Sequence, residues 1–146
     1  MKLSSRADYG LRAILELALL YSTGQPVQVK DIAERQEIPE DYLGQLMVAL
    51  RRAGLVRSVR GPSGGYTLAR PPRELTLTEV IEALEGPLTE PSSPDLFAGG
   101  AASSAFVIAE AWARATSAAR EVLDSITIED LCQRQRDLAA ALTYHI

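Results

Sequence analysis

The chain has 146 residues, 47% of them hydrophobic and 23% charged, which excludes a disordered or fibrous protein and favours one compact domain with an appended element. A single cysteine, Cys132, excludes a disulfide framework and a zinc site built from cysteine pairs. The net charge of -4 divides into +4 over residues 1–73 and -8 over residues 74–146, as expected for a polyanion-binding head on an acidic body.

Three short helices are predicted in the first 54 residues. The first runs from a cap at Ser4 or Ser5 to about Tyr21, and the second covers Val29–Gln36. After a tight turn, the third runs from Pro39 to about Ala53, with Gly54 as its terminating glycine. The apolar stretch in the first helix is interrupted by charges, so it is neither a membrane span nor a secretory signal. We therefore expect a cytoplasmic protein with no membrane partner.

The hydrophobic period then changes from helical to extended. Residues Leu55–Val59 and Tyr66–Ala69 enclose a glycine-rich turn, which predicts a two-stranded hairpin. The order helix, short helix, turn, helix, hairpin is that of a winged helix-turn-helix. The predicted fold class is therefore mainly α with a small β hairpin, with residues 1–86 forming a DNA-binding winged helix-turn-helix domain.

The second half contains three further predicted helices. One covers Thr76–Leu84, and after residues 87–104, a flexible loop rich in Gly, Pro, Ser and Ala, a long helix begins at a Ser103 or Ser104 cap and ends near Ser125. Thr127 caps a last helix, along which Leu131, Gln135, Leu138 and Leu142 recur. Residues 105–146 are thus predicted to hold a long dimerisation helix and a C-terminal helix.

The long helix carries an apolar stripe that suits pairing with a second copy. One winged helix buries modest surface, whereas two heads on paired helices can bind two half-sites of a palindrome. The predicted dimerisation residues are Ile108, Trp112, Ala115, Ala119, Val122 and Leu123. The alternative is that this stripe packs back on its own domain, because a stripe alone does not identify its partner.

The outer face of the third helix is the predicted base-reading surface. Gln45 can pair with adenine, Asp41 or Glu40 can accept from cytosine, and Arg52 can hold a phosphate. Gly44 lies on the same face. The alternative is an ordinary solvated face, because polar residues opposite a core stripe are what amphipathicity requires.

The hairpin indicates DNA contact more sharply. Glycines 61, 64 and 65 allow a tight turn and close approach to another molecule, and Arg57 and Arg60 stand beside them. An arginine at a hairpin tip suits a narrow minor groove and the flanking phosphates. The alternative, a glycine turn with a solvated arginine, is common for isolated hairpins, but here a helix-turn-helix precedes the hairpin.

Several segments together resemble the Rrf-two family of bacterial transcription regulators. They are Tyr9-Gly10-Leu11-Arg12-Ala13, Asp31-Ile32-Ala33-Glu34, Ile38-Pro39-Glu40-Asp41-Tyr42-Leu43-Gly44-Gln45-Leu46, the wing run from Ala53 to Tyr66, and Glu85-Gly86. The resemblance covers residues 1–86 in detail and extends in outline to about 131. It implies a homodimeric winged-helix protein, usually a repressor, whose long helix crosses to the partner. The expected DNA-binding set is Glu40, Asp41, Tyr42, Gly44, Gln45, Arg52, Arg57, Ser58, Arg60, Gly61, Gly64, Gly65 and Tyr66.

Two departures from the family pattern matter. The family's iron-sulfur sensors carry three cysteines in the loop before the long helix, whereas residues 86–112 here contain neither Cys nor His. Cys132 and the distant His145 cannot replace three loop ligands, so we expect no cofactor and no metal. Gly44 stands where cluster-sensing relatives often carry a glutamate, which removes one base-reading side chain.

The resulting expectation is a sequence-specific DNA-binding transcriptional regulator. It would act as a homodimeric repressor on a palindromic operator in double-stranded DNA, under the control of a small metabolite, a partner enzyme or nothing. The alternative is a winged-helix module that binds protein and shows no salt-sensitive DNA affinity. An enzyme is the weakest option, because no catalytic constellation can be assembled around the lone His145.

Overall fold

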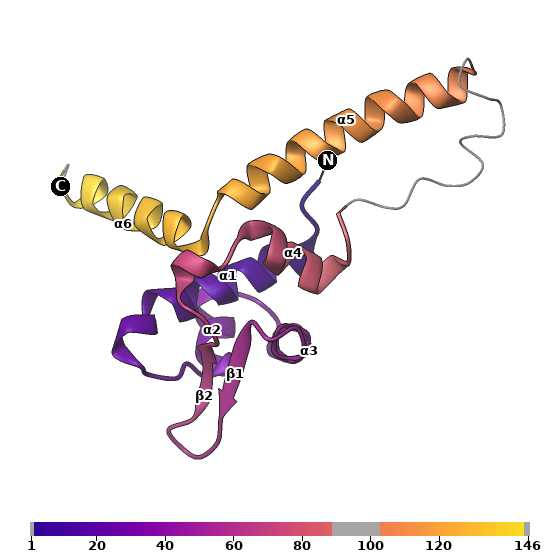
Figure 1. Cartoon of the computed structure of the whole chain (residues 1–146). Coiled ribbons are helices and arrows are strands. Elements are labelled where there is room, and N and C mark those ends of the chain that lie inside the picture. The colour runs from indigo at the N-terminus through magenta and orange to yellow at the C-terminus, as the bar shows by residue number, and fades with distance from the viewer. Residues whose placement is uncertain (1, 89–102, 145–146) are drawn as a thin grey trace.

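The computed structural model describes residues 2–88 and 103–144, and its elements follow the predicted order (Figure 1). They are α1 (Ser5–Leu19), η1 (Tyr21–Thr23), α2 (Val29–Gln36), α3 (Glu40–Arg52), β1 (Val56–Val59), β2 (Gly65–Leu68), η2 (Pro72–Glu74), α4 (Leu77–Glu85), α5 (Ser104–Ser125) and α6 (Ile128–Tyr144), where η1 and η2 are short 3₁₀ helices. The mainly helical fold with one antiparallel hairpin, a winged helix-turn-helix followed by a long helix, is confirmed.

The element boundaries differ from the sequence-based predictions by one or two residues. Ser4 caps α1 by accepting from the Ala7 N–H, but the helix ends at Leu19 and the chain continues as η1. Pro39 is the cap of α3, not its first helical residue. Each strand is shifted or shortened by one residue, because hydrogen bonding, not side-chain period, sets where a strand begins.

One hydrophobic core joins α1, α2, α3, the hairpin and α4. Its fully buried members include Ile14, Ile32, Leu43, Leu46, Met47, Leu50 and Val80. The first turns of α6 also belong to it, through Ile128 and Cys132. Of the residues that recur along α6, Leu138 and Leu142 are exposed, because the buried residues of α6 lie in its first turns.

Two short bridges tie distant segments together, and neither was predicted. Val27 pairs with Tyr66, with N···O distances of 2.9 and 2.8 Å, which adds a third extended segment beside the hairpin. Thr76 pairs with Thr127, because the Leu77 N–H donates to the Ile126 carbonyl and the Ile128 N–H donates to the Leu75 carbonyl. The link between α5 and α6 is therefore held against the segment that precedes α4.

The long helix α5 projects from the body (Figure 1). The Ser103 hydroxyl caps it by accepting from the Phe106 N–H at 3.2 Å, as predicted, and none of its residues is buried. Residues 89–102 of the predicted flexible loop lie outside the described residues. Within the described ranges, no helix is long and apolar enough to cross a membrane.

Candidate nucleic-acid interface

The turn between α2 and α3 holds the two helices of the motif at a fixed angle. Glu37 adopts a left-handed conformation with φ of 54°, and the Ile38 N–H donates to the Ala33 carbonyl at 3.0 Å. Ile38 is buried, so its side chain anchors the turn in the core. The orientation of α3 relative to α2 is thus fixed by packing as well as by the backbone.

The two faces of α3 divide as the sequence predicted. The inner face is fully buried, and the outer face exposes Asp41, Gln45 and Arg52 to solvent. Glu40 is exposed in the first turn. A Cβ added at Gly44 would meet no atom within 4 Å, so this glycine lies on open surface in the middle of the helix. An outer face with amide, carboxylate and guanidinium groups can contact base edges and phosphates in a major groove.

Tyr42 lies differently from the other predicted α3 residues. It is half-buried and packs against the edge of the core. Its ring meets that of Tyr9 edge to face, with ring centroids 6.0 Å apart. Packing between α1 and α3 is therefore sufficient to account for this tyrosine.

The wing residues divide between the two faces of the hairpin. Ser58 pairs with Tyr66, and both lie on the face that carries the buried Val56, because alternate residues of a strand share a face. Arg57 pairs with Thr67 on the opposite face. There it lines a hollow of about 500 Å³ together with residues of η1. The structure therefore does not bring Arg57 and Ser58 to one surface.

The wing positions 61, 64 and 65 need glycine for different structural reasons. A Cβ at Gly64 would collide with the carbonyl oxygens of Val59 and Gly61, and one at Gly65 would collide with the Val27 carbonyl. These two glycines are required by close approach within the chain itself. Gly61, with φ of 106°, turns the backbone in open space beside the exposed Arg60. Residues 60–63 at the tip are all exposed, so the tip is accessible to another molecule.

The start of α2 was not among the predicted site residues. Gln28 and Lys30 are exposed there, and the Gln28 amide donates to the Pro62 carbonyl of the wing at 3.3 Å. They line a hollow of about 290 Å³ with Glu40 and Gly61. The start of α2, the start of α3 and the wing thus form one continuous surface. A lysine in the first turn of the second helix was the available sequence signal.

An exposed recognition helix, a preceding positioning helix and a basic-tipped wing define a winged helix-turn-helix DNA-binding protein. The family model that matches residues 3–134 is Rrf2, described as an iron-dependent transcriptional regulator. The chain therefore belongs to the Rrf2 family, which the sequence resemblance had indicated.

Individual relatives agree with this assignment. The chain is 39% identical to the HTH-type transcriptional regulator CymR of Bacillus subtilis over 139 residues, covering 90% of this chain and 89% of CymR. It is 48% identical to IscR of Cereibacter sphaeroides over 86 residues, covering 58% of this chain and 56% of that one. The solved structure of B. subtilis CymR matches with a TM-score of 0.79, 37% identity and coverage of 92% and 98%. T. potens IscR matches with a TM-score of 0.75 at 40% identity, covering 92% and 88%. The chain is thus a DNA-binding transcriptional regulator.

The residues of this chain do not fit the cysteine-held iron site that an iron-dependent family would imply. Cys132 is the one cysteine of the sequence, and it is buried in the core on α6. Burial raises the pKa of its thiol, which disfavours the thiolate that a cluster needs. Within residues 2–88 and 103–144, no group of three or more His, Cys, Asp or Glu side chains could hold a metal.

Proposed function

We propose that the chain is a homodimeric repressor that binds a palindromic operator in double-stranded DNA, in the cytoplasm and without an iron-sulfur cluster. The outer face of α3 would enter the major groove, where Gln45 and Asp41 contact base edges and Arg52 contacts a phosphate. The exposed Arg60 at the wing tip would contact the adjacent minor groove.

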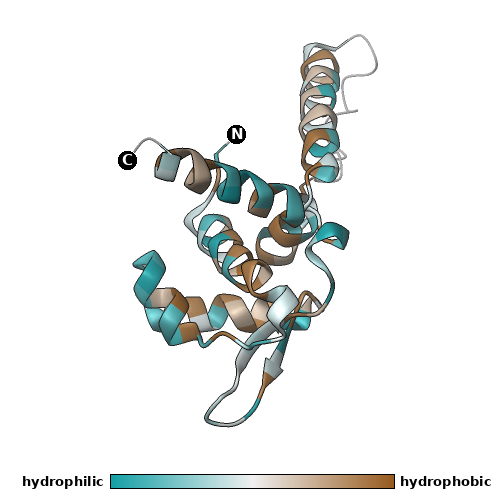
Figure 2. Cartoon of the chain, turned by 90° about the vertical axis from the view of Figure 1, so that its left-hand side faces the viewer, coloured by the Kyte–Doolittle hydropathy of each residue, from teal (hydrophilic) through white to brown (hydrophobic). Residues whose placement is uncertain are grey.

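The solvent exposure of apolar side chains on α5 is the observation that supports dimerisation most strongly. In the isolated chain, Ile108 and Trp112 are each 69% exposed and Val122 is 58% exposed. Figure 2 shows hydrophobic residues along this helix although it projects from the body. A helix of 22 residues with no buried side chain has little tertiary support of its own, and burying this face against a second copy would supply it.

The predicted seam divides in the structure. Ile108, Trp112, Ala115 and Val122 are exposed and available to a partner, whereas Ala119 and Leu123 are half-buried in the chain itself. The alternative, packing of the whole stripe on its own domain, is not favoured by this distribution. The exposed residues of the stripe are spread along both halves of α5.

The experiment that tests this proposal combines operator selection with a measurement of mass. Genomic fragments are selected with the purified protein, aerobically and anaerobically, and the enriched site is titrated across a salt series. We expect two inverted half-sites, a dimer by sedimentation, and an affinity that falls steeply with salt, with a log–log slope of about -0.9 per neutralised phosphate. Equal binding with and without oxygen is expected from a protein that uses no cluster. No selective enrichment under either condition would overturn the proposal.

A further inference from the structure

The backbone fixes α5 at its C-terminal end. There, the Leu77 N–H donates to the Ile126 carbonyl at 3.0 Å, and the Ile128 N–H donates to the Leu75 carbonyl at 2.8 Å. These two bonds set the point from which α5 leaves the body. These bonds do not set the direction of α5, which depends on side-chain contacts closer to the middle of the helix.

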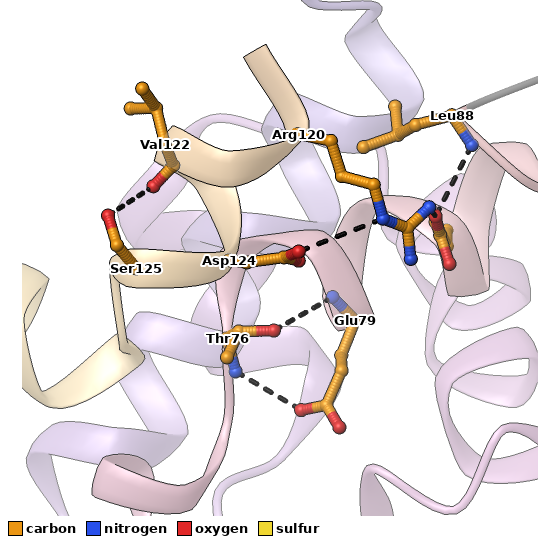
Figure 3. Close-up of polar contacts among 8 residues, drawn as sticks. Thr76, Glu79, Leu88, Arg120, Val122, Asp124 and Ser125 are labelled. Atoms are coloured by element: carbon orange, nitrogen blue, oxygen red, sulfur yellow. Dashed lines mark hydrogen bonds and ion pairs between the residues drawn. The ribbon is translucent and has the colours of Figure 1, made fainter. Parts of the chain in front are cut away.

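An ion pair provides such a contact (Figure 3). The Arg120 Nη1 on α5 lies 2.6 Å from the Glu82 Oε1 on α4. The same Glu82 oxygen accepts from the Leu88 N–H at 3.3 Å, and the Arg120 Nε lies 3.7 Å from Asp124 on its own helix. The Arg120 and Glu82 side chains are 37% and 28% exposed. Both groups are therefore held by more than one contact while remaining partly in solvent.

The α4 side of this pair is packed into the same body as the recognition helix. Ile81 and Leu84 of α4 are buried, and α4 packs against both α1 and α3. The Arg6 Nε of α1 also donates to the Leu84 carbonyl at 2.6 Å. The guanidinium on α5 is thus attached to a helix that is rigidly part of the DNA-binding body.

We propose that Arg120 and Glu82 are positioning residues that set the angle of α5 to the DNA-binding body, and with it the half-site spacing that the dimer prefers. This inference rests on the dimer of the proposed function. The 22 residues of α5 span about 33 Å at about 1.5 Å per residue, so a tilt of about 6° about the anchored C-terminal end moves the far end by about 3.5 Å. That displacement is close to one base pair of duplex, at about 3.4 Å per base pair. A dimer formed through α5 would transmit it to the separation of the two α3 helices.

The test measures spacer preference. Glu82→Gln, Arg120→Gln and the double variant are titrated against operators whose half-sites are unchanged and whose central spacer is shortened or lengthened by one base pair. A single half-site duplex and sedimentation are measured alongside. We expect each variant to remain a dimer and to keep its half-site affinity. Its discrimination between the best spacer and its neighbours should fall by about fivefold, as for the loss of a half-exposed ion pair.

Two comparisons separate a positioning role from a structural one. Glu129→Gln is the control, because it removes the carboxylate of another partly exposed ion pair, in which Arg136 Nη1 lies 3.2 Å from Glu129 Oε1. Both residues of that pair lie within α6, so this variant should leave the spacer profile unchanged. The double variant should be no worse than either single variant, because both remove the same interaction. If Glu82→Gln and Arg120→Gln both kept the wild-type spacer profile, this inference would be overturned while the proposed dimer would stand. A wild-type protein that is monomeric on DNA, or indifferent to spacer length, would overturn the dimer and this inference together.

Discussion

At the scale of single residues, Arg60 is the exposed wing arginine that we propose contacts a DNA groove. It is exposed at the tip beside Gly61, while Arg57 faces the hollow near η1. A guanidinium at such a tip can enter a narrow minor groove without rearrangement of the strands.

We therefore expect Arg60→Ala to weaken operator binding by about tenfold and to lower the salt slope by about 1, as for the loss of one phosphate-contacting cation. Thermal melting should be unchanged, because the residue is exposed. DNA titration across a salt series measures both quantities. Arg134→Ala, which removes an exposed arginine from α6, is the matched control. Equal losses in the two variants would indicate a general charge effect and contradict the wing contact.

Two glycines in the DNA-binding domain should respond to alanine with opposite signs. Gly44 lies in the middle of α3 and faces solvent, so Gly44→Ala should stabilise the fold by about 1 kcal/mol through helix propensity. Gly64→Ala would drive a methyl group into the Val59 and Gly61 carbonyls and should cost about 2 kcal/mol. Urea denaturation measures both changes. A Gly64→Ala protein as stable as the wild type would show that the wing can rearrange around a side chain.

At the scale of elements, α4 begins with a reciprocal cap. The Thr76 Oγ1 accepts from the Glu79 N–H at 3.2 Å, and the Glu79 carboxylate accepts from the Thr76 N–H at 3.1 Å (Figure 3). Because α4 packs against α1 and α3, the fraying of its first turn would be felt by the whole domain.

Thr76→Ala should therefore lower the free energy of unfolding by about 1 kcal/mol, the usual effect of losing an N-cap hydroxyl. Chemical denaturation followed by circular dichroism measures this difference. Thr76→Ser keeps the hydroxyl and should retain most of the stability. A serine variant as unstable as the alanine variant would show that the methyl group, not the cap, matters here.

The elements themselves were predictable because their signals are local. Helical spacing of apolar residues, the Ser4 and Ser103 caps and the change of period at the hairpin all act within a few neighbouring residues. The Val27–Tyr66 and Thr76–Thr127 bridges were not predictable, since each joins segments far apart in sequence through backbone atoms that carry no side-chain pattern. Burial of Cys132 in the core depends on the second bridge, which brings α6 against the body.

The candidate site was predictable to a similar degree. The outer face of α3 followed from rotation about a helix axis, which is why Asp41, Gln45 and Arg52 lie where expected. Tyr42 could not be separated from them, because its contact with Tyr9 is tertiary. The structural requirement for Gly64 also came only from three-dimensional contacts within the wing.

At the scale of the whole molecule, the wing and α5 extend from opposite sides of the body (Figure 1). This arrangement separates the surface proposed for DNA from the surface proposed for a second copy. Pairing through α5 could then place two wings on one face of a duplex without either contact obstructing the other.

Trp112 belongs to the proposed seam and is the one tryptophan of the sequence, so its fluorescence reports on that seam directly. Trp112→Glu should give a monomer by sedimentation, because a carboxylate would be buried between two apolar faces. Operator affinity should fall by about a hundredfold with the loss of the second linked head, while half-site affinity is retained.

The wild-type emission should shift to shorter wavelength as concentration rises, since Trp112 is 69% exposed in the single chain and would become buried in the dimer. Ser117→Glu is the matched control: at about 100° per residue it lies about 140° around α5 from Trp112, and its charge should remain in solvent. Melting of the Trp112→Glu monomer should still be cooperative, because no described member of the hydrophobic core cluster lies on α5. A Trp112→Glu protein that stays dimeric would place the contact between copies elsewhere on the chain and would remove the purpose proposed for the exposed face of α5.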